Sequence, residues 1–265
     1  MIDGRLELVF AVRGERTVLA HARASAPLKI VRPFFLEDGR ALVQILTLGP
    51  GLCAGDMCSV DVTVEPGARA IVITQAASRI LGMTEEQQAA QRVTLRVRAD
   101  AQLEYFPGLT IPFPGSSFVQ HVEVDAQAGA RVGVVETWAM GRSGCGEYLQ
   151  FRRVRSETTL TVDGVPLYAD VIDLEPAAVN VAGTGILDGR RYLASGFWYG
   201  ATLPAALPVP PQDMLVAIGQ TAPNQVYLRA LADDGFGLGE TLQAIIRSVH
   251  AGWRLRPIPI RRFTS

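Results

Sequence analysis

The chain has 265 residues, of which 48% are hydrophobic and 19% charged, and its formal net charge is -1. This composition excludes a disordered chain, and the lack of net positive charge argues against a protein that binds nucleic acid or anionic lipid by electrostatic attraction. Three cysteines do not pair evenly, and the sequence shows neither a secretory signal nor a run of roughly 18 apolar residues, so we expect a cytoplasmic protein without disulfides.

The first two thirds of the chain are dominated by alternation with a period of two. Apolar and polar residues alternate at 59–64, 92–98 and 121–125. This pattern predicts strands that bury one face and expose the other to water. Turn residues separate the runs, and Asp163-Gly164 lies where a tight two-residue hairpin is expected, because that turn needs positive φ.

Three segments of this region resemble one another. Each of 62–72, 96–106 and 123–134 reads as a strand, a short turn, an alanine and a second apolar strand. The shared alanines are Ala68, Ala101 and Ala130. Repetition of one such unit along the chain is typical of stacked hairpin-like rungs, each of which buries a face that it could not bury alone. We therefore expect an all-β dominated fold of stacked rungs, like a β-helix or solenoid.

Helical patterns are expected only near the C-terminus. A short helix is predicted at 211–219, a strand at 225–231 and a longer helix at 239–251, where apolar residues recur at helical spacing. No regular element beyond a short extended run is expected over 254–265. Because no linker divides the chain, we expect one domain over 1–265, with a β-rich body over 1–205 and a small helix-containing α/β part over 206–265.

Few residues have the spacing of a metal or catalytic site. The three histidines are far apart, and Cys53 and Cys58 have no second pair, whereas a closed zinc site needs about four ligands. Neither a nucleophile elbow nor a phosphate-binding loop is present. We predict no tightly bound metal and no catalytic residue.

Two segments have polar residues where apolar ones are expected. Alternation places Glu136 on the same face as the core residues of its strand, where an unpaired charge is costly. It could form a structural ion pair near Arg142 and Glu147, or belong to a polar strip that lines a wet channel or partner site. Thr74 and Ser78 follow a buried strand, and could line a cavity or cap the strand end.

These segments and their neighbours resemble the urease accessory protein family UreD, also called UreH. The matching stretches are 51–56, 73–78, 104–107 through 111–113, 136–138 through 141–142 to 146–147, and Asp163-Gly164 with Pro166-Leu167. The resemblance extends from about Pro27 to the C-terminal helix, and the ordered combination is more specific than any one motif.

The resemblance implies a right-handed β-helix-like body and a scaffold that is not an enzyme. Members bind UreF, which holds the GTPase UreG, and dock on apo-urease, and they are implicated in passing nickel to the urease active site through an internal passage. The candidate passage or partner-binding residues are Asp56, Thr74, Gln75, Ser78, Glu136, Arg142 and Glu147. A conduit should lack clustered histidines and thiolates, because nickel(II) binds such ligands strongly, and their scarcity here fits a conduit and an inert scaffold equally well. Nickel is expected only in transit.

Two other functions fit the sequence. One is a β-solenoid enzyme acting on carbohydrate with Glu136 and Glu147 as acid and base, which would need carboxyl groups roughly 5–10 Å apart across a cleft. The other is a self-assembling structural protein. An open groove with exposed aromatic side chains would favour the enzyme.

Overall fold

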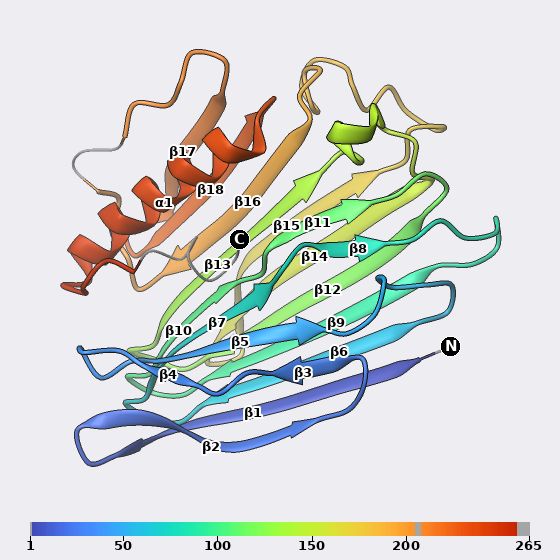
Figure 1. The fold of residues 1–265 in the computed structure, drawn as a ribbon. Coiled ribbons are helices and arrows are strands. Elements are labelled where there is room, and N and C mark those ends of the chain that lie inside the picture. The colour runs from blue at the N-terminus through green and yellow to red at the C-terminus, as the bar shows by residue number, and fades with distance from the viewer. Residues whose placement is uncertain (1, 205–207, 259–265) are drawn as a thin grey trace.

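Two β-sheets face each other in the computed structural model, which describes residues 2–204 and 208–258 (Figure 1). Sheet A has the strand order β15-β14-β12-β9-β6-β1-β2. Its strands are β1 (Asp3–Arg13), β2 (Arg16–Ala24), β6 (Met57–Val64), β9 (Ala89–Val97), β12 (Ser117–Ala126), β14 (Arg153–Val162) and β15 (Val165–Leu174).

Sheet B has the order β17-β18-β16-β13-β10-β7-β5-β3, with β4, β8 and β11 paired at its margins. Its strands are β3 (Leu28–Ile30), β4 (Phe34–Phe35), β5 (Ala41–Thr47), β7 (Arg69–Gln75), β8 (Ser78–Ile80), β10 (Gln102–Phe106), β11 (Leu109–Pro112), β13 (Arg131–Ala139), β16 (Tyr192–Tyr199), β17 (Leu215–Ala222) and β18 (Gln225–Ala232).

The repeated units form a solenoid, as the sequence predicted, but they are not hairpins. Each unit starts in sheet A and crosses to sheet B, so β6, β9 and β12 pair in parallel in one sheet and β7, β10 and β13 in the other. The shared alanines are buried at the crossings, and the amide of Gln102 donates to the carbonyl of Ala68 in the rung before it. Hydrogen bonds therefore join successive rungs instead of the two strands of one rung.

The main core lies between the two sheets and is filled by the inward-facing residues of every rung. In β6 the buried positions alternate with more exposed ones, and Val60, Val62 and Val64 belong to this core. The predicted hairpin is confirmed: β14 and β15 are joined by Asp163 and Gly164, with φ of 47° and 78°.

The outer face of sheet B carries a second core, which helix α1 (Gly235–Gly252) covers (Figure 1). The helix predicted at 239–251 is confirmed and begins one turn earlier, where the Asp234 side chain accepts from the amides of Phe236 and Gly237. Leu242, Ile245 and Val249 face the sheet. Among the described residues no helix could span a membrane.

The helix predicted at 211–219 is wrong, because most of that segment belongs to β17. Pairing with β18 satisfies the backbone groups on one side of this edge strand, and Val216 and Ile218 pack at alternate positions against the second core. Gly219 does not end a helix; it lies opposite Tyr227, whose ring would contact a side chain there. The strand predicted at 225–231 is confirmed as β18.

A buried triad of charged and polar groups fixes α1 to the sheet. Glu104 Oε1 lies 2.5 Å from His250 Nε2, and its Oε2 lies 3.3 Å from Arg40 Nη1, with all three side chains fully buried. Arg40 also donates to the carbonyl of Arg256, the last part of the described chain. The predicted boundary at 205/206 and the predicted tail beyond 258 lie outside the described residues.

Candidate functional site

Glu136 lies between the two sheets, as its place in the alternation predicted. It stands on the inner face of β13 and is 5% exposed. Its Oε1 accepts hydrogen bonds from Gln120 and Ser156 of sheet A, and its Oε2 accepts one from Thr158 Oγ1 at 2.8 Å. The ion pair considered from the sequence is therefore not formed, since all three donors are neutral.

This environment alters the ionisation of the carboxyl group. Burial raises the pKa of Glu136 from 4.5 to about 7, against the lowering effect of the donors Thr158 and Gln120, and the carboxylate of Asp170 raises it further. The group can therefore be charged or neutral near physiological pH.

The partners of Glu136 belong to a row of polar residues that crosses sheet A. In the strand register Cys58 lies beside Gln91, Gln91 beside Gln120, and Gln120 beside Ser156, on the inner faces of β6, β9, β12 and β14. Thr158 is the next inward residue of β14 after Ser156, and in the strand register it lies opposite Asp170 of β15. The row arises because rungs that stack in register align the same position of each strand.

Sheet B presents a facing row. In the strand register Glu136 lies opposite Ser195 of β16, and Ser195 lies opposite Arg229 of β18. The two rows meet at Asp170, which accepts from Ser195 Oγ at 2.5 Å and from Arg229 Nη2 at 2.6 Å. Asp170 and Arg229 have side chains 18% and 38% exposed, so this end of the rows reaches solvent.

The Cys58 end of the row on sheet A borders a small cavity of about 40 Å³, lined in part by Cys58, Gln91, Thr74, Ser78 and Tyr105. Because one water needs about 10–15 Å³, this space can hold a few. We call these two rows and the cavity residues the polar belt. Its members are Cys58, Thr74, Ser78, Gln91, Tyr105, Gln120, Glu136, Ser156, Thr158, Asp170, Ser195 and Arg229.

The thiol of the polar belt is neutral at physiological pH. Burial raises the pKa of Cys58 to about 11, and the carboxylates of Asp56 and Asp3 add to the effect. Since the thiolate is the strong metal ligand, a metal ion at this thiol would first have to displace its proton.

The remaining predicted site residues lie outside the polar belt. The carboxylate of Asp56 accepts from the amides of Ile2 and Cys53, which makes it a local structural group. Gln75 is exposed at the end of β7.

Arg142 and Glu147 pair with each other. Two guanidinium nitrogens of Arg142 donate to the Glu147 carboxylate, and the same guanidinium lies 4.2 Å from the ring centre of Phe113. The hydrogen bond from Arg142 lowers the pKa of Glu147. Glu136 is buried between the sheets, whereas the Glu147 carboxylate binds Arg142, and the two carboxylates share no partner among the hydrogen bonds of the described chain.

The sequence did contain a signal for the residues that were missed. In β6, β9, β12 and β14 a polar residue or cysteine occupies one of the inward positions, as Gln91 does two residues before Val93 and Gln120 two residues before Val122. The alignment of these positions appears once the rungs are superimposed. In the described part of the chain, no three histidine, cysteine or acidic side chains cluster as a metal site would require.

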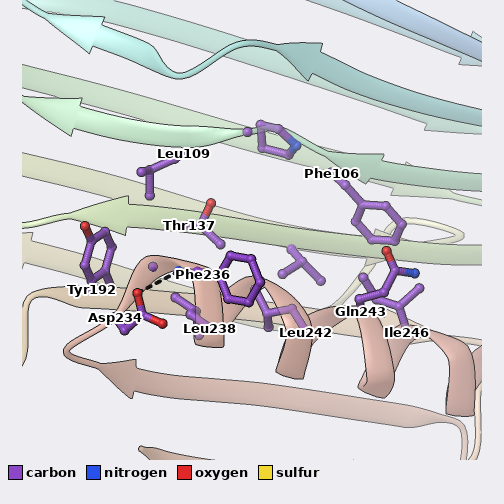
Figure 2. Close-up of a pocket in the computed structure, with 15 residues that line it drawn as sticks. Phe106, Leu109, Thr137, Tyr192, Asp234, Phe236, Leu238, Leu242, Gln243 and Ile246 are labelled. Atoms are coloured by element: carbon purple, nitrogen blue, oxygen red, sulfur yellow. Dashed lines mark hydrogen bonds between the residues drawn. The ribbon is translucent and has the colours of Figure 1, made fainter. Parts of the chain in front are cut away.

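A larger apolar pocket of about 490 Å³ lies on the other side of sheet B, under the N-terminal half of α1. Figure 2 shows Phe106 and Leu109 of the sheet side facing Leu238 and Leu242 of the helix across it. Phe236 at its rim is 63% exposed. An exposed aromatic side chain beside an apolar pocket is typical of a surface that binds another protein.

Comparison with known proteins gives consistent matches over nearly the whole chain. The sequence profile described as UreD urease accessory protein matches residues 3–265. The chain is 35% identical over 264 residues to "Urease accessory protein UreD 1" of Synechococcus sp. (strain JA-3-3Ab), covering 98% of this chain and 96% of the relative. It is 34% identical to "Urease accessory protein UreD" of Deinococcus radiodurans, with 98% and 94% covered.

Proposed function

Because the chain belongs to the UreD family of urease accessory proteins, we propose that it is a non-catalytic scaffold of urease maturation that assists nickel delivery to the urease active site. In this proposal it binds partners of the UreF and UreG kind and apo-urease. A role in urease maturation follows from the family itself; the partners and the nickel step are the proposed part.

The observation that carries the nickel step is the polar belt across an otherwise apolar core. Oxygen atoms of Glu136, Ser156 and Thr158 converge between the sheets, and Asp170 continues them to the surface. Burying polar groups is costly unless they are hydrogen-bonded, as these are, and oxygen ligands hold nickel(II) less tightly than clustered nitrogen or sulfur ligands do. A row of oxygen ligands beside the neutral thiol of Cys58 would bind nickel(II) weakly enough for the ion to pass along the polar belt.

The ionisation of Glu136 supports the same step. With a pKa of about 7, the carboxyl group gives up its proton to an arriving cation at little cost near neutral pH. When the cation leaves, the group can take up a proton again and need not stay buried as a bare charge. Binding of nickel at Glu136 would therefore release a proton, and its departure would take one up.

The apolar pocket under α1 supports the scaffold role. It combines about 490 Å³ of volume with the exposed ring of Phe236. Because partner binding would use this outer side of sheet B and transit the inner side, the two roles can be tested with different variants.

The test is reconstitution of urease with the full set of accessory proteins and nickel, using Glu136→Gln and Glu136→Ala. We expect both variants to co-purify with the accessory proteins and apo-urease, and to lower both urease activity and its nickel content by about tenfold or more. Glu123→Gln is the control, because Glu123 lies on the outer face of β12 and pairs with Arg92. Full activation by Glu136→Gln would remove the basis for transit, and failure of the wild-type protein to associate with any partner would refute the scaffold.

A further inference from the structure

The outer end of the polar belt is closed by an ion pair. Arg229 follows Glu136 and Ser195 in the row on sheet B, and its guanidinium lies 2.6 Å from Asp170 on the opposite sheet. The three residues occupy the adjacent strands β13, β16 and β18, and along this row the side chains change from buried at Glu136 and Ser195 to partly exposed at Arg229. Asp170, the surface carboxylate of the belt, has one oxygen occupied by Arg229 and the other by Ser195.

The charge of Arg229 opposes any cation at this end. It is the one permanently charged cationic side chain in the polar belt, and a guanidinium stays protonated at all physiological pH values. A divalent cation approaching Asp170 must displace a positive group already bound there, and like charges at a few ångströms repel strongly in a partly buried site. The partly exposed Arg229 side chain can move outward without unfolding β18.

We propose that Arg229 is a cationic gate, whose ion pair with Asp170 keeps divalent cations out of this end of the polar belt until Asp170 is released. The inference rests on the proposed function, since it assigns control of entry or exit to the same belt. When Arg229 moves away, the Asp170 carboxylate is freed opposite Thr158, which binds Glu136. The carboxylates of Asp170 and Glu136 and the hydroxyls of Ser195 and Thr158 then offer oxygen ligands to a cation.

The test measures nickel(II) affinity of the purified full-length protein by competition with a chromophoric chelator. We expect Arg229→Gln to lower the Kd for nickel(II) by about tenfold or more, because a repelling charge is removed at contact distance. Arg229→Lys should stay within about threefold of wild type, since it keeps the charge. Combining Arg229→Gln with Asp170→Asn should abolish the gain.

The matched control is Arg92→Gln, which removes the guanidinium from Glu123 in a similar pair of 2.9 Å on the outer face of sheet A. It should bring no gain, because Glu123 lies outside the polar belt. Unchanged affinity in a folded Arg229→Gln protein would overturn the gate, as would a gain that persists without Asp170. Arg229→Met serves as a second neutral variant, and misfolding of both neutral variants would show Arg229 to be structural. Because the readout is affinity of the isolated chain, this test can fail while reconstitution with Glu136 variants succeeds, and the reverse.

Discussion

Replacing Glu136 by glutamine should stabilise the protein at alkaline pH and have little effect at acid pH. Glutamine keeps the size and an acceptor oxygen for Thr158 or Gln120, but it cannot ionise. In the wild-type protein the folded state holds the proton more tightly than the unfolded state does, because burial raises the folded pKa from 4.5 to about 7. The stabilisation by the protonated form is complete below pH 4.5 and is lost as the pH rises through 7.

The magnitude follows from this difference. One pKa unit corresponds to about 1.4 kcal/mol, so the shift represents about 3 kcal/mol at pH 8, most of which develops between pH 5 and pH 8. A domain is stable by about 5–15 kcal/mol, so this is a measurable share. We expect the free energy of unfolding of Glu136→Gln, relative to wild type, to be about 2 to 3 kcal/mol higher (the variant more stable) at pH 8 than at pH 5, by the same conversion of about 1.4 kcal/mol per unit.

Urea unfolding at pH 5, 6, 7 and 8 measures this quantity, and urea avoids the screening of charges that guanidinium causes. Comparing each variant with wild type at the same pH cancels effects of all other titrating groups. Glu123→Gln is the control and should change stability by less than about 1 kcal/mol at every pH, as expected for an exposed pair. A pH-independent difference for Glu136→Gln would refute the burial argument and with it the ionisation assigned to the polar belt.

Three further predictions test the fold around the site. Gly133→Ala should destabilise the protein by about 1–3 kcal/mol in urea unfolding, because its Cβ would lie 2.7 Å from the indole of Trp198, whereas Gly144→Ala, with no atom within 4 Å, should be neutral. In the native protein iodoacetamide at pH 8 should modify the two exposed cysteines and spare Cys58, as judged by mass spectrometry; rapid labelling of Cys58 would show that its end of the belt is open. Asp56→Ala should cost about 2–3 kcal/mol in urea unfolding, because two backbone amides lose a charged acceptor, and Asp56→Asn should cost less.

The sequence pattern was enough to predict the stacked rungs, because alternation in strands and repeated turns are local properties. The long C-terminal helix and the hairpin at Asp163-Gly164 were predicted for the same reason. The helix expected at 211–219 failed because pairing with β18 outweighed weak local propensity. Local signals of that kind cannot show which strand will lie beside a segment.

Alternation also placed Glu136 inside the core, but it could not identify the partners. Arg142 is nearer to Glu136 in sequence than any of its donors, yet Arg142 binds Glu147. Glu136 instead accepts hydrogen bonds from Gln120, Ser156 and Thr158 of the opposite sheet. Those donors are 16 to 22 residues away along the chain, and they reach Glu136 because the two sheets face each other.

What the sequence alone determined is therefore the character of each strand position, inward or outward and polar or apolar, since a strand's period of two fixes it. What only the tertiary structure decided is which polar positions line up and meet. Register between rungs aligned Cys58, Gln91, Gln120 and Ser156 in one row, and the closure of the two sheets brought Asp170 to Arg229 across 59 residues of chain. The pairing depends on the packing of whole sheets, and no local stretch of residues encodes it.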